Sequence, residues 1–354
     1  MAKKEERDIV ILNERIALGE SKTIDFSIAK LYTTTPVEIP IIIERSKIPG
    51  PTVLLTAALH GDEINGVEII RQIIAKKYNK PKRGTIICVP ILNVFGFLNG
   101  NRFYPDGRDL NRVFPGTKTG SLASRVAYHF TKKILPHADY CIDFHTGGAS
   151  RHNAPQIRIK PGDERLMNLA KVFNAPFTIY SNTIEKSYRI TCAKMGIPSL
   201  LFEGGKSLES NKDVVKEGVD GVLRVLHHLD MLNKKNPPAA AHGKTVIIAK
   251  SKWIRAQRSG LLHVKVESDK HVEKGEFLAT ITDPYGKMRF KVSAPNEGYI
   301  INVNQSPIVN QGDAIFHIST ATVPYDQPHI ESEEVKTAAL TTEINEQEQA
   351  TNQV

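Results

Sequence analysis

The chain has 354 residues, of which 40% are hydrophobic and 24% charged, and its formal net charge is +9 at pH 7. These values are typical of a globular protein of about two domains. No apolar run approaches the roughly 20 residues of a transmembrane helix, and the charged start MAKKEERDIV lacks the apolar core of a secretory signal. The composition therefore argues against a membrane protein and against a secreted protein.

The charge is unevenly distributed along the chain. Residues 321–354 carry a net charge of −6, which leaves +15 on the remainder. Because the basic residues are dispersed and not interleaved with aromatics, we expect a small anionic substrate and no nucleic-acid partner. Cys88, Cys141 and Cys192 stand far apart in apolar surroundings, which is typical of free thiols in the cytoplasm. No sequence pattern indicates an oligomeric state.

The first two thirds of the chain alternate between strand and helix patterns. Residues 1–50 hold short apolar runs between polar turns, which predict β-structure packed on a core. Residues 51–233 then read as an α/β catalytic domain. Strands are predicted at Val53–Leu59, Thr85–Asn93, Ala138–Phe144 and Ile197–Phe202, and helices from Gly66 to about Tyr78 and at Ser121–Ile134, Arg165–Phe173 and Val214–Leu232. Residues 96–120 are polar, glycine-rich and aperiodic, so we expect a long functional loop there.

The pattern changes after this domain. Residues 234–243 are rich in proline and alanine and predict a linker. Short strands separated by turns predict a smaller all-β domain at 244–320. Residues 321–354 are polar, acidic and poor in aromatics, so we expect a disordered tail.

Three of the predicted strands stop at residues that can bind a metal. The first stops at His60, with Glu63 three residues later, and two others stop at His145 and Glu203. Ligand sites of open α/β sheets lie at the carboxyl ends of strands, so we expect these side chains to converge. Two histidines and a carboxylate are the usual protein ligands of a catalytic zinc that keeps one position for water. Glu203 is then the candidate for moving the proton of that water.

The long loop adds cations to this site. Arg102, Arg108 and Arg112 occur within eleven residues, beside Asp109 and Asn111. Guanidinium groups bind carboxylates bidentately and stabilise a developing oxyanion. The loop therefore predicts an anion site next to the metal.

The motifs HGDE, RDLNRVFPG, DFHTG and FEGG occur in the order found in the succinylglutamate desuccinylase/aspartoacylase family, which the chain resembles from Thr52 to about Leu232. That family is related to zinc carboxypeptidases. The resemblance implies a mixed sheet flanked by helices, one zinc ion per chain and removal of an acetyl or succinyl group from a small N-acyl amino acid.

The resemblance also implies individual roles. His60, Glu63 and His145 would be the zinc ligands, Glu203 the general base and acid, and Arg102 the group that polarises the scissile carbonyl. Asn111, Arg112 and Arg189 would bind the substrate carboxylate, and Asp109 would orient His60 through its other ring nitrogen. Tyr285 and Tyr299 are candidates for a tyrosine that aspartoacylases contribute from their C-terminal part, and Arg108 has no counterpart.

Other interpretations of the same residues are open. The C-terminal strands resemble biotinyl and lipoyl domains, with Lys287 at the position of a modified lysine. The preceding residues 283–286 depart from the carrier motif, which favours a structural lid over the active-site mouth. A metallocarboxypeptidase acting on short peptides and a non-catalytic binding protein on the same scaffold are the alternative functions.

Overall fold

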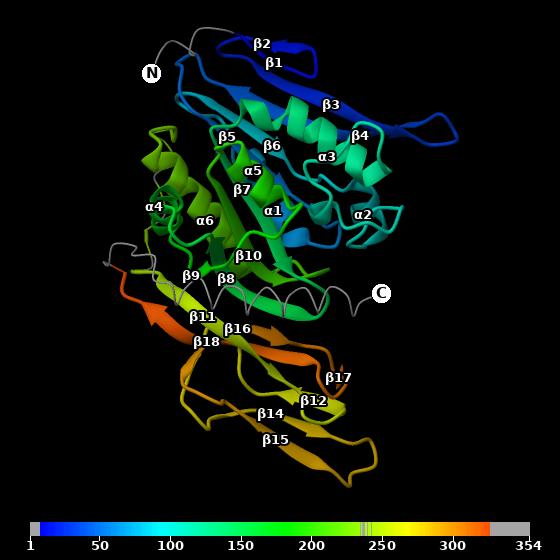
Figure 1. The fold of residues 1–354 in the computed structure, drawn as a ribbon. Helices are drawn as coiled ribbons and strands as arrows, with labels where there is room; N and C mark the ends of the chain where they lie inside the picture. Colours follow the sequence, from blue (N-terminus) through cyan, green and yellow to red (C-terminus); the bar gives the residue numbers. More distant parts are fainter. Residues whose placement is uncertain (1–7, 234, 236–237, 239, 242, 326–354) are drawn as a thin grey trace.

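A twelve-stranded sheet forms the centre of the molecule in the computed structural model, which describes residues 8–325 apart from 234, 236–237, 239 and 242 (Figure 1). The strands in the described residues are β1 (Ile9–Ile11), β2 (Glu14–Ile16), β3 (Ser21–Lys30), β4 (Pro36–Arg45), β5 (Thr52–Ala57), β6 (Thr85–Val89), β7 (Tyr140–Gly147), β8 (Arg151–Ile159), β9 (Phe177–Tyr180), β10 (Ser199–Lys206), β11 (Val246–Arg255), β12 (Gly260–Val264), β13 (His271–Val272), β14 (Phe277–Thr282), β15 (Arg289–Ser293), β16 (Gly298–Asn304), β17 (Ile308–Val309) and β18 (Ala314–Val323). The helices there are α1 (Ile64–Ala75), α2 (Val94–Asn99), α3 (Leu122–Lys133), α4 (Glu164–Phe173), α5 (Tyr188–Lys194) and α6 (Lys212–His228), with 3-10 turns at Leu110–Arg112 and Leu135–His137.

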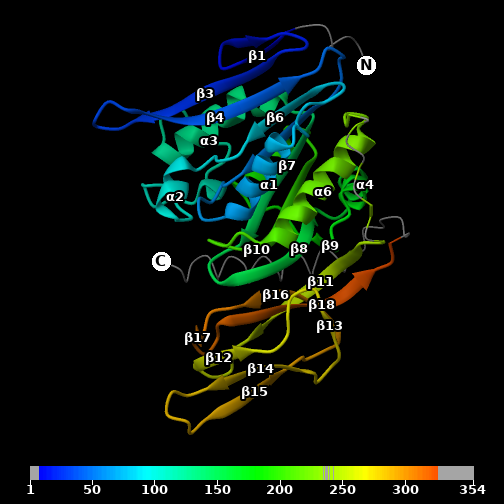
Figure 2. The same ribbon diagram turned by 180° about the vertical axis from the view of Figure 1, so that it is seen from behind.

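Helices cover both faces of the central strands. The strand order is β13-β16-β18-β11-β9-β8-β10-β7-β5-β6-β4-β3, and β5, β6 and β7 pair in parallel. One face packs against α1, α4 and α6 (Figure 2), and the other packs against α3 and α5 (Figure 1). Strands covered on both faces need apolar side chains throughout, which explains the uninterrupted runs of the sequence. The predicted mixed sheet flanked by helices is confirmed. None of the helices in the described residues is both long and apolar enough to span a bilayer.

All four predicted strand ends were wrong. β5 and β6 end before the predicted Leu59 and Asn93, at Ala57 and Val89, whereas the other two strands are longer than predicted. β7 continues past His145 to Gly147, and β10 continues past Glu203 to Lys206. The strands extend because they pair with each other, with Glu203 opposite His145 and Lys206 opposite Gly147. The predicted loop at 96–120 was also wrong in part, since it contains the end of α2 and the 3-10 turn at 110–112.

The C-terminal strands are continuous with the catalytic sheet. β11 pairs in parallel with β9, while β16 pairs with both β18 and β8. Strands β8, β9, β11, β18 and β16 therefore close into a ring. Side chains of Ala154, Phe177, Ile179, Ile248 and Ile301 form a small core there. Strands β15, β14, β12 and β17 form a separate sheet farther from the helices (Figure 1).

The outer segments differ in detail from the sequence prediction. β4 pairs with β6, so β3 and β4 extend the edge of the catalytic sheet itself. β18 reaches Val323 by pairing with Ile247, three residues into the predicted tail. Residues 326–354 of that tail lie outside the described residues.

Candidate metal centre and active site

The turn between β5 and α1 directs His60 and Glu63 to the same point. Glu63 occupies the position before the first residue of α1, and its backbone N–H donates to the His60 carbonyl at 3.2 Å. Gly61 allows this turn to lie against α2, because a Cβ there would stand 2.0 Å from the carbonyl carbon of Gly96. His60 and Glu63 are 3% and 1% exposed, so the surrounding packing fixes both side chains.

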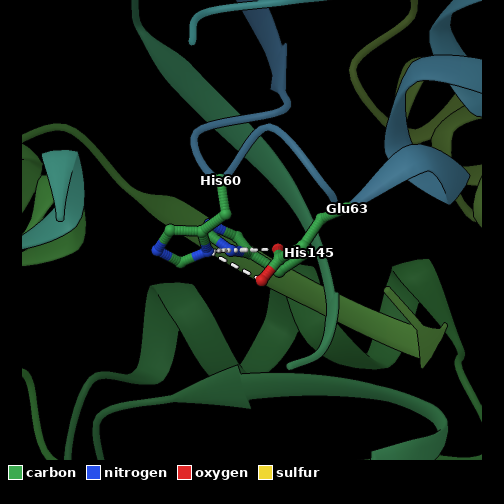
Figure 3. Close-up of side chains that lie close together, drawn as sticks. All are labelled: His60, Glu63 and His145. Atoms are coloured by element: carbon green, nitrogen blue, oxygen red, sulfur yellow. Dashed lines mark hydrogen bonds and ion pairs between the residues drawn. The ribbon is translucent and has the colours of Figure 1, made fainter. Parts of the chain in front are cut away.

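His145 reaches the same point from β7 (Figure 3). Its Nδ1 lies 3.2 Å from Nδ1 of His60 and 2.8 Å from Oε2 of Glu63. Nδ1 of His60 lies 2.7 Å from Oε1 of Glu63. The ligand atoms of the three residues all lie within 4.8 Å of one another, and all three residues are buried. This cluster can hold a metal ion.

A carboxylate orients each imidazole from behind. Nε2 of His60 lies 3.1 Å from Asp109 Oδ1, and Nε2 of His145 lies 2.8 Å from Asp143 Oδ2. The hydroxyl of Thr56 donates to the other Asp143 oxygen at 2.7 Å. Both histidines thus present Nδ1 to the cluster, an arrangement typical of metal-binding histidines. The sequence analysis overlooked Asp143, although residues two apart on a strand share a face, so its position before His145 was a usable signal.

The charges in the cluster compensate one another. Burial alone raises the pKa of the Glu63 carboxyl, but His60 and His145 hold that pKa well below its usual range. Burial lowers the pKa of His145, but Asp143 and Glu63 outweigh it and raise that pKa well above the ordinary value. Glu63 is therefore an ionised carboxylate that faces Nδ1 of both rings and accepts from the backbone N–H of Thr146 at 3.1 Å.

Arg102 borders the cluster. Its Nη2 and Nε atoms donate to Asp109 Oδ2 at 2.8 and 3.2 Å, and Nη1 donates to Glu63 Oε1 at 3.3 Å. The side chain is 27% exposed. The guanidinium is thus held in place by two carboxylates while part of it faces outward.

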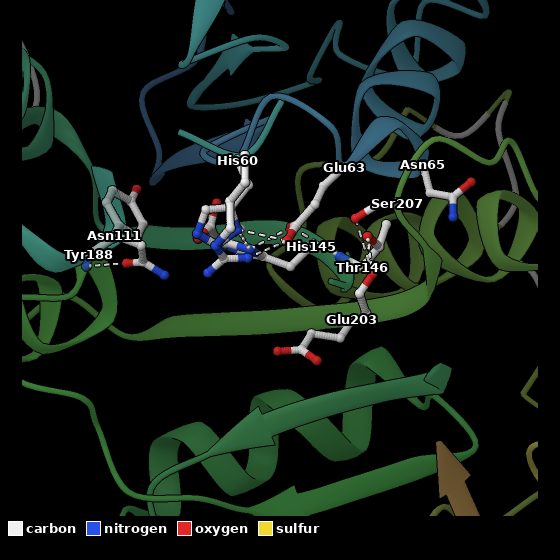
Figure 4. A network of polar contacts seen from close by, with 12 residues as sticks. His60, Glu63, Asn65, Asn111, His145, Thr146, Tyr188, Glu203 and Ser207 are labelled. Carbon is white, nitrogen blue, oxygen red and sulfur yellow. Dashed lines mark hydrogen bonds and ion pairs between the residues drawn. The ribbon is translucent and has the colours of Figure 1, made fainter. Parts of the chain in front are cut away.

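Glu203 lies on the strand beside His145 (Figure 4). Asn153 Nδ2 donates to its Oε2 at 2.8 Å, and Arg158 Nε lies 3.4 Å from the same oxygen. Within the described residues no hydrogen bond or ion pair joins Glu203 to His60, Glu63 or His145. The Glu203 side chain is 15% exposed, and both contacts hold the carboxylate through the same oxygen, Oε2.

The residues predicted to bind the substrate carboxylate lie to one side of the cluster. Asn111 Oδ1 accepts the backbone N–H of Tyr188 at 2.8 Å (Figure 4), and Arg112 Nη1 donates to the Asn111 carbonyl at 3.0 Å. Arg189 directly follows Tyr188, and its guanidinium donates to Ser181 Oγ at 3.0 Å. Arg112 and Arg189 are thus linked through Asn111 and Tyr188. None of these contacts reaches the cluster directly.

The two candidate tyrosines differ in their surroundings. Tyr285 is 81% exposed on the turn between β14 and β15. Tyr299 packs edge-on against Phe177, with ring centroids 5.5 Å apart. Neither contact pattern points to the cluster.

Comparison with known sequences places the site in a family. Residues 49–229 match the succinylglutamate desuccinylase/aspartoacylase catalytic domain. The chain is also 27% identical over 293 residues to the N-alpha-acetyl-L-2,4-diaminobutyric acid deacetylase of Halomonas elongata, covering 79% of this chain and 84% of that protein.

Solved structures show the same architecture. A succinylglutamate desuccinylase/aspartoacylase from Rhodobacter sphaeroides superposes with a TM-score of 0.73 at 25% identity, covering 86% of this chain and 95% of that one. The product-bound ectoine utilization protein EutE of Ruegeria pomeroyi superposes with a TM-score of 0.72 at 24% identity, covering 85% and 95%. The chain therefore belongs to the succinylglutamate desuccinylase/aspartoacylase family, whose members are hydrolytic deacylases that act on amide bonds.

Proposed function

We propose that the protein is a zinc-dependent hydrolase that removes an acetyl or succinyl group from a small N-acyl amino acid. The observation that carries this proposal is the buried convergence of His60, Glu63 and His145 beside Arg102. The named activity of the Halomonas elongata relative supports an acetylated amino acid as the substrate.

The donor set fits zinc. Two imidazole nitrogens and one carboxylate are the protein ligands of many catalytic zinc sites. Nδ1 of His60, Nδ1 of His145 and the Glu63 carboxylate would hold the ion, because these ligand atoms lie close together in a buried cluster. When bound, zinc would lower the pKa of its water to about 7 and polarise the acyl oxygen.

The protein side chains would divide the remaining work. Arg102, which is held by Asp109 and Glu63, would donate to the oxyanion that develops on the acyl oxygen. Glu203 would take the proton of the attacking water on Oε1 and deliver it to the leaving amine, since Oε2 is already held by Asn153. Asn111, Arg112 and Arg189 would bind the substrate carboxylate.

The cellular setting belongs to the proposal as well. Cys88, Cys141 and Cys192 are free and buried, which favours a reducing compartment such as the cytoplasm. Burial and the nearby Glu44 raise the pKa of Cys88 to about 12, which keeps it an unreactive thiol.

One experiment tests both the metal and the reaction. Protein purified without chelator is analysed for metal content and incubated with N-acetyl and N-succinyl amino acids, with free amine as the readout. We expect about one zinc per chain, turnover in the wild type, and retained zinc without turnover in Glu203→Gln. The control is Glu267→Gln, an exposed position in the loop between β12 and β13, which should behave as wild type.

The other outcomes identify the alternatives. Zinc with turnover of short peptides only would establish a metallocarboxypeptidase. Absence of any bound metal, together with no turnover of N-acyl amino acids or of short peptides, would overturn the proposal and leave a binding protein.

A further inference from the structure

The Glu203 carboxylate is connected to the C-terminal strands through two buried amides. Asn153 on β8 donates from Nδ2 to Glu203 Oε2 at 2.8 Å. Asn302 on β16 donates from its own Nδ2 to Asn153 Oδ1 at 2.7 Å. Asn153 and Asn302 are 4% and 2% exposed. We call this series, from Glu203 through Asn153 to Asn302, the amide chain.

The amide chain has only one workable direction. An ionised carboxylate accepts hydrogen bonds and donates none, so Asn153 must turn its NH₂ group toward Glu203. The side-chain carbonyl of Asn153 then faces Asn302, whose NH₂ group donates a hydrogen bond to it. The donor on β16 therefore stabilises the orientation in which the Asn153 NH₂ group faces the carboxylate.

The backbone holds this chain in register. Asn302 stands opposite Asn153 where β16 pairs with β8, and opposite His317 where it pairs with β18. His317 in turn stacks on Trp253 of β11, with ring centroids 4.5 Å apart and planes 11° apart. Directly opposite residues on paired strands share a face. Asn302 is consequently fixed on both sides by the strands that close the ring.

We propose that Asn302 is a positioning residue for the reaction: it holds Asn153, and through it the Glu203 carboxylate, so that Oε1 faces the reacting water. This inference rests on the proposed role of Glu203. Within the described residues Oε2 accepts from Asn153 and lies 3.4 Å from Arg158 Nε, whereas Oε1 has no hydrogen bond and is left for proton transfer. In this way the C-terminal strands contribute Asn302, which acts on Glu203 through Asn153.

The proposal is tested by removing the donor that faces the Asn153 side-chain carbonyl. In Asn302→Asp the Asn153 amide lies between two carboxylates, so its carbonyl faces a carboxylate in either orientation and the direction toward Glu203 is no longer fixed. We expect kcat to fall about 10–100-fold, as for other residues that orient a functional group, with KM and zinc content unchanged. Asn302→Ser retains a donor and should recover part of the loss.

A matched control lies two residues farther along the same strand. Asn304 Nδ2 donates to the Ala314 carbonyl, within the C-terminal strands. Asn304→Asp introduces the same charge and should leave kcat within about twofold of wild type. If Asn302→Asp and Asn304→Asp lower kcat equally, or if KM rises with the fall in kcat, the positioning role is refuted.

A double-mutant cycle assigns the effect to Glu203. In a Glu203→Gln background, Asn302→Asp should not lower the residual turnover further, because the group that it positions is already gone. Additive losses would show that Asn302 acts independently of Glu203.

A spectroscopic measurement separates this inference from the proposed function. The side-chain ¹⁵N–¹H signals of Asn302 should shift in Glu203→Gln, because the change at one end of the amide chain passes through Asn153. Unshifted signals would overturn the inference even if the enzyme turns over substrate. If shifted signals are found without turnover on any substrate, the proposed function fails while the amide chain is upheld.

Discussion

Nδ1 of His60 and Nδ1 of His145 lie 3.2 Å apart, although 85 residues separate them in the chain. They meet because β5 and β7 are adjacent parallel strands. Two imidazole nitrogens so close together, in contact with one ionised carboxylate, can hold a metal ion.

His145→Ala should abolish zinc binding, because it removes one of the three proposed ligands. At free zinc of about 100 times Kd, the wild type should gain about 2.7 kcal/mol of unfolding free energy, and the variant should gain none. Thermal unfolding with and without zinc measures this difference. His263→Ala, at an exposed position on β12, should respond as the wild type does. Equal stabilisation of both variants would remove His145 from the ligand set.

Asp143→Asn should weaken zinc binding by about 10–100-fold, because the carboxylate orients the His145 ring through Nε2. A competition titration with a zinc chelator measures the affinity. The control is Asp139→Asn four residues earlier, where the carboxylate accepts the Thr52 backbone N–H at 2.8 Å instead. The assignment is wrong if both variants bind zinc as tightly as the wild type.

Arg102→Ala should lower kcat by about 10²–10³-fold while zinc remains bound, because it removes the proposed donor to the developing oxyanion. Arg102→Lys retains the charge but not the forked contact with Asp109, so we expect only partial recovery. Arg108→Ala, exposed in the same segment, should leave kcat unchanged. A loss of zinc from Arg102→Ala would instead indicate a structural role at the cluster.

Gly61→Ala should reduce stability by about 1–3 kcal/mol, because the new Cβ would stand 2.0 Å from the Gly96 carbonyl carbon and 2.1 Å from the Phe97 nitrogen. Backbone atoms cannot rotate away as side chains do, so the turn that carries His60 must shift. Chemical denaturation measures the change. Gly148→Ala is the control, since its Cβ would meet only Arg102 Nη1 at 3.7 Å. Equal stability of the two variants would show that the turn relaxes without cost.

His317 should make the protein sensitive to acid. Burial, with the nearby Arg158, lowers the pKa of His317 to about 3, so the folded state keeps this ring neutral. The unfolded chain takes up that proton below a pKa of about 6.5. Between those values the unfolded state binds more protons, and stability falls by about 1.4 kcal/mol per pH unit as the pH drops. His317→Phe should show a shallower loss between pH 6 and pH 4 in denaturant titrations, and an unchanged slope would contradict this account.

The sequence by itself determined the local parts of this protein. Buried strands, amphipathic helices and the turn that brings His60 near Glu63 depend on residues a few positions apart, so patterns in the chain indicate them. The sequence also placed His145 and Glu203 at buried strands, but that the two residues lie opposite each other is a finding of the structure.

Only the tertiary structure decided the contacts made by pairing distant strands. The closure of β16 onto β8, the amide chain to Glu203 and the contact of Asn111 with Tyr188 each join segments at least 50 residues apart. The register of these strands depends on how all the strands together bury their apolar faces. A short motif does not contain that information. For the same reason, the sequence indicated which histidines meet, while the fold selected the ring nitrogen that each one turns toward the cluster.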